Sequence, residues 1–569
     1  MKNRIMNFSR AILPVILGTF FSLNVFSQEL VTGLQVNQVI KSYLKTNTGI
    51  SERTGGNQAD TIKLPFFDDF SNYKVFPHKS LWCDNYAFVN SNYTRSDTIY
   101  LPPSIGVATL DVIDENGTVY SPANYTHFAA DNMTSNPINL EYYIESRYEN
   151  NSITYDVESL FYHDKCTDSY NQASSLLYRN QIDGKYYSAG SSNYYDTYGS
   201  LYYFNTCTDD YTEINDSLFY FDSSDDSYNF IERLQEQINF QQSDNIFLSF
   251  FYQPQGLGDE PEETDSLVVE FFSPIDSAWY WQWTAHGNSI QKFKHVILPV
   301  NEDIYFGNGF QFRFRNYASL TGLTYPSRVS NVDHWNIDYV KLDKDRSLDD
   351  TVYHDVTFIK PLKSILKDYE AVPWTHVDTF MLNHDLLKDT LKVIYYNNDS
   401  VERVVNNLQL NIYNEPEDEY FLLEGGNPEI EKNTLVVFDQ FRITYPFFVS
   451  SDIDSALFEV SCNFTTDNFD PAWNNSISRK QKFYNYYAYD DASAENGYGI
   501  INKGFVAYRF NNLDITDSLR GVHMYFNHAW ENSNFNYFYL TVWAVNDEGK
   551  PGDVLYSYTQ WQARTKIHR

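Results

Sequence analysis

Two of the four cysteines stand at positions that favour disulfide chemistry. Cys166 and Cys207 occupy the same place in a repeated motif, SLFYHDKCTDSY and SLYYFNTCTDDY. Copies of this motif begin at Ser159, Ser200 and Ser217, with a degenerate copy at Ser175. Each copy reads as a short apolar strand, a polar turn and an aromatic return, which is typical of a hairpin. Copies that pack in register would bring the two thiols together; the alternative is two free thiols in similar turns.

Aromatic side chains form the second candidate site. Trp279, Trp281 and Trp283 alternate in the segment AWYWQW, so a regular strand would place them on one face and Tyr280 on the other. If exposed, this row would be a platform on which sugar rings stack. The sequence favours the alternative, a buried row in a sandwich core, and makes the Tyr-rich repeat the better candidate for an adhesive surface.

Motifs of enzymes are missing from the sequence. It contains no GxSxG, HExxH or Walker motif, and no Cys/His cluster with the spacing of a zinc site. We therefore predict that the chain is not an enzyme. Two carboxylates that face each other across a groove remain the alternative, because glycoside hydrolysis requires only their spatial proximity.

Composition and the N-terminus narrow the class of protein. The 569 residues carry a formal net charge of −34 and are 18% aromatic, which excludes nucleic acid as a partner and disfavours extended disorder. Lys2, Arg4 and Arg10 precede an apolar stretch, and Ser27 is followed by Gln28 at a small-residue cleavage pattern. We interpret residues 1–27 as a signal peptide rather than a membrane anchor, and expect a secreted or outer-surface protein with no transmembrane span.

Short alternating segments separated by Asn, Asp, Gly and Pro predict an all-β chain of antiparallel sandwiches. In residues 309–315, for example, Phe alternates with Gln or Arg. The predicted divisions are a polar leader at 28–63, a jelly-roll-like sandwich at 64–345 with Tyr-rich hairpin repeats inserted at 141–240, an immunoglobulin-like sandwich at 351–478, and a partial third sandwich at 483–569. Residues 230–238 have the spacing of a short helix.

Several segments together resemble the large secreted surface proteins of Bacteroidetes, many of which are cargo of the type IX secretion system. They are PFFDDFS, PPSIGVATLDVIDENG, FLSFFYQPQGLGDEPEETDSLVVEFF, WNIDYVKLD and YAYDDASAENGYG. The first sandwich is also similar to MAM-type and carbohydrate-binding jelly rolls. Members of the family usually continue past such a third unit and end in a C-terminal sorting domain. Here the last unit has too few strands to close a sandwich, so we expect a truncated product.

The resemblance implies a bound calcium ion and O-glycosylation. Similar jelly rolls hold a structural calcium ion between their first and last strands, and the matching residues here are Asp68, Asp69 and Asp338, which otherwise would cap turns or pair with arginines. Similar secreted proteins carry O-glycans at Asp-Ser/Thr-aliphatic tripeptides, where the alternative is an ordinary turn before a strand. The corresponding residues are Thr61, Thr98, Ser217, Ser266, Ser277, Thr351, Thr390, Ser400, Ser455 and Ser518.

These observations favour a secreted or cell-surface protein that binds a glycan or another protein surface. A carbohydrate-active hydrolase on a jelly-roll scaffold and a purely structural surface protein are the alternatives. Calcium is the one cofactor that the sequence suggests.

Overall fold

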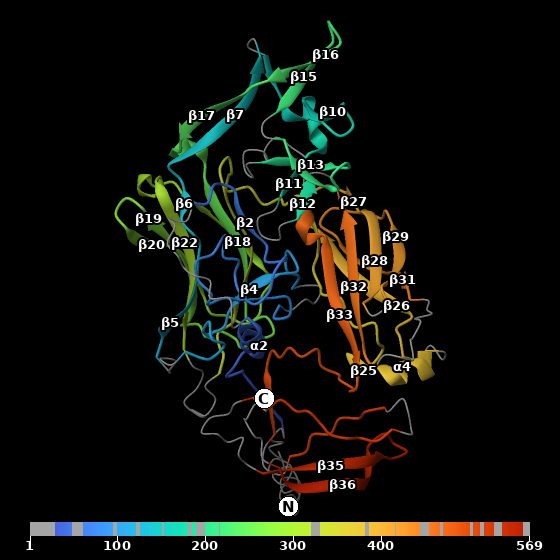
Figure 1. The fold of residues 1–569 in the computed structure, drawn as a ribbon. Coiled ribbons are helices and arrows are strands. Elements are labelled where there is room, and N and C mark those ends of the chain that lie inside the picture. Colours follow the sequence, from blue (N-terminus) through green and yellow to red (C-terminus); the bar gives the residue numbers. More distant parts are fainter. Residues whose placement is uncertain are drawn as a thin grey trace, which may run out of the picture. The chain divides into compact units, whose positions relative to one another are not determined.

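The computed structural model confirms the prediction of an all-β fold built from antiparallel sheets (Figure 1). It describes residues 29–47, 61–94, 100–120, 126–150, 153–179, 185–188, 200–214, 217–319, 330–381, 386–415, 417–443, 454–466, 470–500, 504–511, 517–527 and 537–561. The predicted signal peptide, residues 1–27, lies outside these ranges. No helix in the described part of the chain is long and apolar enough to cross a membrane. The chain divides into a small unit with β1 and β34 to β36, and a large unit with the other elements.

The first sandwich of the large unit consists of a six-stranded and a five-stranded sheet. The six strands are β2 (Phe66–Asp68), β3 (Phe88–Asn90), β4 (Val107–Leu110), β18 (Phe247–Pro254), β21 (Lys294–Pro299) and β23 (Trp335–Asp343). The five are β5 (Phe128–Thr134), β6 (Ile138–Asn139), β19 (Ser266–Ser273), β20 (Ala278–His286) and β22 (Asn308–Ala318). Along β22, Phe310, Phe312 and Phe314 are fully buried in the core between the sheets, which leaves the alternating Gln and Arg residues on the outer face.

The second sandwich pairs a three-stranded with a five-stranded sheet. Its elements are β24 (Val356–Phe358), β26 (Thr390–Asn397), β31 (Leu435–Arg442), β25 (Ala371–Pro373), α4 (Trp374–Met381), β28 (Asn406–Asn414), β29 (Glu419–Gly426), β32 (Ala456–Thr465) and β33 (Ser476–Tyr484), with β27 (Arg403–Val404) and β30 (Glu429–Ile430) as a separate pair. β33 continues to Tyr484, past the predicted boundary at residue 478, because Phe483 is buried in the core of this sandwich.

The predicted polar leader contains regular structure in its described residues. Strand β1 (Glu29–Thr32) pairs with β34 (Gly497–Ile500) in the small unit, which also holds the hairpin of β35 (Phe538–Val545) and β36 (Pro551–Trp561). Helix α2 (Gln38–Thr46), in the large unit, begins where the Asn37 side chain accepts hydrogen bonds from the backbone N–H groups of Val39 and Ile40. Ile40 is buried against Val75 and Ile113. The short helix is stabilised by this packing, which the local sequence does not reveal.

The Tyr-rich insertion forms a separate module on a two-stranded stem of β7 (Tyr142–Asn150) and β17 (Arg233–Asn239), with β8 (Ile153–Tyr155) beside β7 (Figure 1). Residues 230–238, predicted as a helix, instead lie in β16 and β17, because β17 pairs along its full length with β7. Four hairpins follow the four copies of the motif: β9 (Phe161–Asp164) with β10 (Ser169–Gln172), β11 (Leu177–Arg179) with β12 (Tyr186–Ser188), β13 (Leu201–Asn205) with β14 (Asp210–Glu213), and β15 (Leu218–Asp222) with β16 (Ser227–Ile231).

The repetition of one sequence motif explains the core of this module. The first hairpin pairs with the fourth and the second with the third, which gives two four-stranded sheets. The leucine that follows the serine in every copy is buried in one shared core: Leu160, Leu176, Leu201 and Leu218. Each copy therefore contributes the same side chain to the centre, and no single hairpin has a core of its own.

Candidate functional site

The aspartates expected to bind calcium do not form one ligand set. Both oxygens of Asp68 accept hydrogen bonds: Oδ1 from the Phe70 N–H, and Oδ2 from the Tyr73 hydroxyl and the Trp82 indole. Burial raises the pKa of Asp68 to about 7. With three donors on its two oxygens, this carboxylate holds the aromatic side chains beside β2 in place.

Asp338 is instead bonded within the first sandwich, and Asp69 takes part in a contact between the two sandwiches. Asp338 accepts hydrogen bonds from the backbone and hydroxyl of Ser104. Asp69 Oδ2 accepts from Asn474 Nδ2 at 3.0 Å, and the same amide nitrogen lies 3.1 Å from both oxygens of Asp355. Burial, and then the neighbouring charges of Asp470 and Asp69, raise the pKa of Asp355 well above its usual range.

A different group of acids does come together at one end of the first sandwich. Glu262 and Asp265 belong to the loop that joins β18 to β19, and Asp333 lies just before β23. One oxygen from each lies within 4.8 Å of the others. Burial and the neighbouring carboxylates raise the pKa of Asp265 to about 6 and that of Asp333 to about 10. Sequence reasoning missed this group because Asp333 comes from a distant segment, although the acidic run DEPEETD was visible.

The tryptophan row is broken by a β-bulge. Val269 of β19 pairs with Trp283, whereas the next residue, Glu270, pairs with Trp281, so Gln282 is the extra residue of β20. The bulge reverses the alternation of side chains. Trp283 packs inward against Phe250, with ring centroids 5.3 Å apart, while the Trp281 side chain is 65% exposed. The expectation that all three tryptophans share a face was therefore wrong.

The outer face of the five-stranded sheet combines exposed aromatic and charged groups. Trp281, Glu270 and Arg313 are direct cross-strand neighbours on β20, β19 and β22. Arg313 Nε donates to Glu270 at 2.7 Å, and its guanidinium lies 4.0 Å from the ring centre of Trp279. Trp281 stands beside this fixed ion pair with its indole N–H bonded to Thr284. The face thus offers a flat apolar ring next to oriented donors and acceptors.

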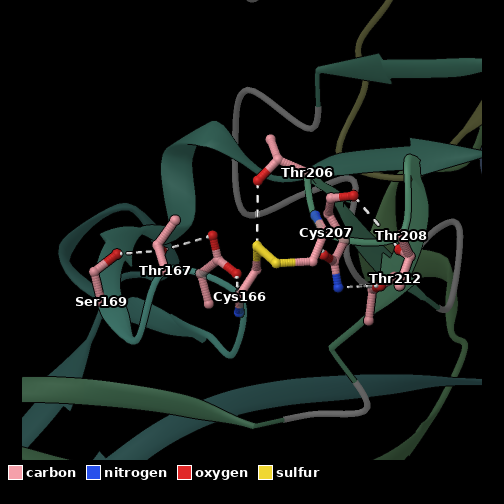
Figure 2. The surroundings of a disulfide bond; sticks show 9 residues. Cys166, Thr167, Ser169, Thr206, Cys207, Thr208 and Thr212 are labelled. Carbon is pink, nitrogen blue, oxygen red and sulfur yellow. Dashed lines mark hydrogen bonds between the residues drawn. A yellow bond between two sulfur atoms is a disulfide. The ribbon is translucent and has the colours of Figure 1, made fainter.

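The repeat module contains the disulfide that the motif suggested. The bond joins Cys166 to Cys207, with Cα atoms 5.7 Å apart. Figure 2 shows the hydrogen bond between the Thr206 hydroxyl and the Cys166 sulfur. The two residues lie in the turns of the first and third hairpins, so the bond connects the two sheets of the module.

Stacked aromatic rings cover the outer faces of the module. On one sheet Tyr170 stacks on Tyr228 with ring centroids 4.1 Å apart, and Phe230 is exposed nearby. On the other sheet Tyr186 stacks on Tyr211 at 3.7 Å. These faces carry aromatic surface, as the sequence suggested for this segment.

The serine and threonine residues of the Asp-Ser/Thr tripeptides differ in accessibility. Ser266 is buried at the start of β19, where Asp265 N–H closes a turn onto the Glu262 carbonyl, so the turn interpretation holds at this residue. Exposed hydroxyl residues are Ser217, Ser277, Thr351, Ser400, Ser455 and Ser518; Thr61 and Thr390 are half-buried, and Thr98 lies outside the described residues.

A cavity of about 380 Å³ lies in the second sandwich between β29 and β31. Its lining includes Glu424 and Arg442 but only one carboxylate. It therefore lacks the pair of acids that glycoside hydrolysis requires.

Together these elements define a multidomain, all-β protein with exposed aromatic faces. No model of a known protein family matches the chain, and no curated protein matches it in sequence. Among solved structures, a calcium-binding mutant of beta-glucuronidase 2 from Bacteroides uniformis is similar at a TM-score of 0.18 and 10% identity, over 42% of this chain and 25% of that one. The chain thus spans a quarter of the length of that protein, and the likeness is too small to bear on function.

Proposed function

We propose that the chain is a secreted or cell-surface binding protein whose first sandwich binds glycan on the outer face of its five-stranded sheet. The exposure of Trp281 beside the Glu270–Arg313 ion pair is the observation that carries this proposal. Apolar faces of sugar rings pack on indole, and the carboxylate and guanidinium would bond the hydroxyl groups.

The charged side chains near Trp281 are held in fixed positions by one another. Glu270 contacts Arg313 at 2.7 Å and Arg315 at 3.6 Å, and Arg315 Nε donates to Asn132 at 2.8 Å. Because these side chains are fixed by one another, binding would not require much loss of side-chain entropy.

Replacing Trp281 with alanine is expected to weaken glycan binding at least about tenfold, as loss of a central aromatic contact does. Trp281 is exposed, so the melting temperature should stay within about 2 °C of the wild type. Binding is measured by screening the full chain on a glycan array and titrating the best ligand by calorimetry.

Tyr420→Ala, an exposed aromatic of the second sandwich, is the matched control and should leave the affinity unchanged. Absence of any bound glycan for the wild type would refute the proposal. Loss of binding in Phe230→Ala instead of Trp281→Ala would move the site to the repeat module. Release of sugar products during incubation would favour the hydrolase alternative.

A further inference from the structure

The acid group at the end of the first sandwich has lone pairs that the protein does not use. Asp265 Oδ2 accepts from the Ser319 hydroxyl and Asp333 Oδ2 accepts from the Ser319 N–H, both at 2.9 Å. Asp333 Oδ1 and Glu262 Oε2 are buried and have no hydrogen-bond donor. Asp265 Oδ1 is likewise buried without a hydrogen-bond donor and lies 3.5 Å from His127 Nε2.

Such an arrangement is unfavourable by itself. Asp265 and Asp333 are both 0% exposed, and each of the three acids has an oxygen within 4.8 Å of the others. Buried carboxylates normally have hydrogen-bond donors or a cation as partners. Here each acid has a buried oxygen without a hydrogen-bond donor, and the three carboxylates meet at one place, which suits ligands around a common centre.

We propose that Glu262, Asp265 and Asp333 bind one calcium ion. All three ligands are hard oxygen donors, which calcium prefers, and water would complete its six to eight ligands. This site is distinct from the set expected at Asp68, Asp69 and Asp338, and it does not depend on the proposed glycan face.

Its place in the fold gives the ion a structural task. The loop with Glu262 and Asp265 leaves β18 in the six-stranded sheet and enters β19 in the five-stranded sheet. Asp333 precedes β23 of the six-stranded sheet. The ion therefore ties the crossing loop to the beginning of β23 and holds the two sheets together at this end.

Calcium at about 10 mM, compared with chelator, is expected to raise the melting temperature of the full chain by about 3 °C or more, and calorimetry should give one site with a Kd of about 1 mM or tighter. Magnesium, which demands a smaller octahedral shell, should give less than half this shift. An equal response to magnesium would contradict the assignment to calcium.

Asp333→Asn supplies the decisive comparison. In chelator it should melt at or above the wild-type temperature, because the amide takes the place of one of three crowded buried carboxyl groups, and it should lose the calcium shift. A purely structural aspartate would not give this pair of effects. Asp111→Asn, a buried acid outside the group, should keep the full calcium shift.

Two results would overturn the proposal. They are an unchanged wild-type melting temperature in about 10 mM calcium, and an undiminished calcium shift in Asp333→Asn. If Asp333→Asn does not fold, Glu262→Gln, at the half-buried member of the group, is read in the same way.

Discussion

Replacing both Cys166 and Cys207 with serine is expected to lower the free energy of unfolding of the repeat module by about 4 kcal/mol. The bond closes a loop with a sequence separation of 41 residues, and its loss restores the corresponding chain entropy to the unfolded state. Limited proteolysis of the full chain, compared with and without reductant, measures the opening of the module.

The effect is large because the module has few other long-range constraints. Its core is built mainly from one leucine and one tyrosine per copy, and its two sheets do not share backbone hydrogen bonds. The disulfide joins a turn of one sheet to a turn of the other (Figure 2). Without it, the sheets are held together mainly by the side-chain packing of the shared core.

Cys83→Ser is the matched control, since Cys83 is a free thiol in the first sandwich. It should leave the cleavage rate of the module unchanged. Reductant should accelerate cleavage of the wild type and have no effect on the double variant. Equal cleavage rates for the double variant and the oxidised wild type would show that the prediction is wrong.

Much of this architecture follows from short-range pattern. The alternation in β22 gave its buried and outer faces, and the repeated Ser-Leu-aromatic-Tyr motif gave the four hairpins, because both signals have the period of the structure that they form. The order in which the hairpins pair does not follow from such a pattern. The first joins the fourth across the module, and no local signal specifies which identical units will meet.

The candidate sites depended on contacts that the sequence does not encode locally. The bulge at Gln282 separates Trp281 from Trp283, yet nothing in AWYWQW distinguishes a bulged from a regular strand. Asp333 joins Glu262 and Asp265 only through the packing of β23 against its neighbours. The alternation of tryptophans in the sequence could therefore indicate a platform, but only the fold shows which of the rings is exposed.

Asp355→Asn is expected to make the stability of the large unit less dependent on pH. Asp470, next to Asp355, accepts hydrogen bonds from the Val356 N–H and from the side chains of Thr466 and Asn475. Its lone pairs are thus occupied as those of an ionised carboxylate. Asp355 must then carry the proton that the pair shares, in agreement with a pKa held well above its usual range by burial and by Asp470.

The sign of the effect follows from proton binding. When the folded pKa is raised, the folded state keeps a proton that the unfolded state has lost, so stability is greatest at low pH and falls as the pH rises toward the folded pKa. One such proton changes the free energy of unfolding by about 1.4 kcal/mol per pH unit. Urea unfolding at pH 5, 6 and 7 should give a slope in Asp355→Asn that is smaller by up to this amount.

The matched variant at the other acid tests which of the two carries the proton. In Asp470→Asn an amide N–H₂ would face donors that need an acceptor, so stability should fall at every pH measured. In Asp355→Asn the amide replaces a protonated acid that already donates, so stability near pH 5 should be retained. A pH slope in Asp355→Asn equal to that of the wild type would show that Asp355 does not carry the proton shared with Asp470.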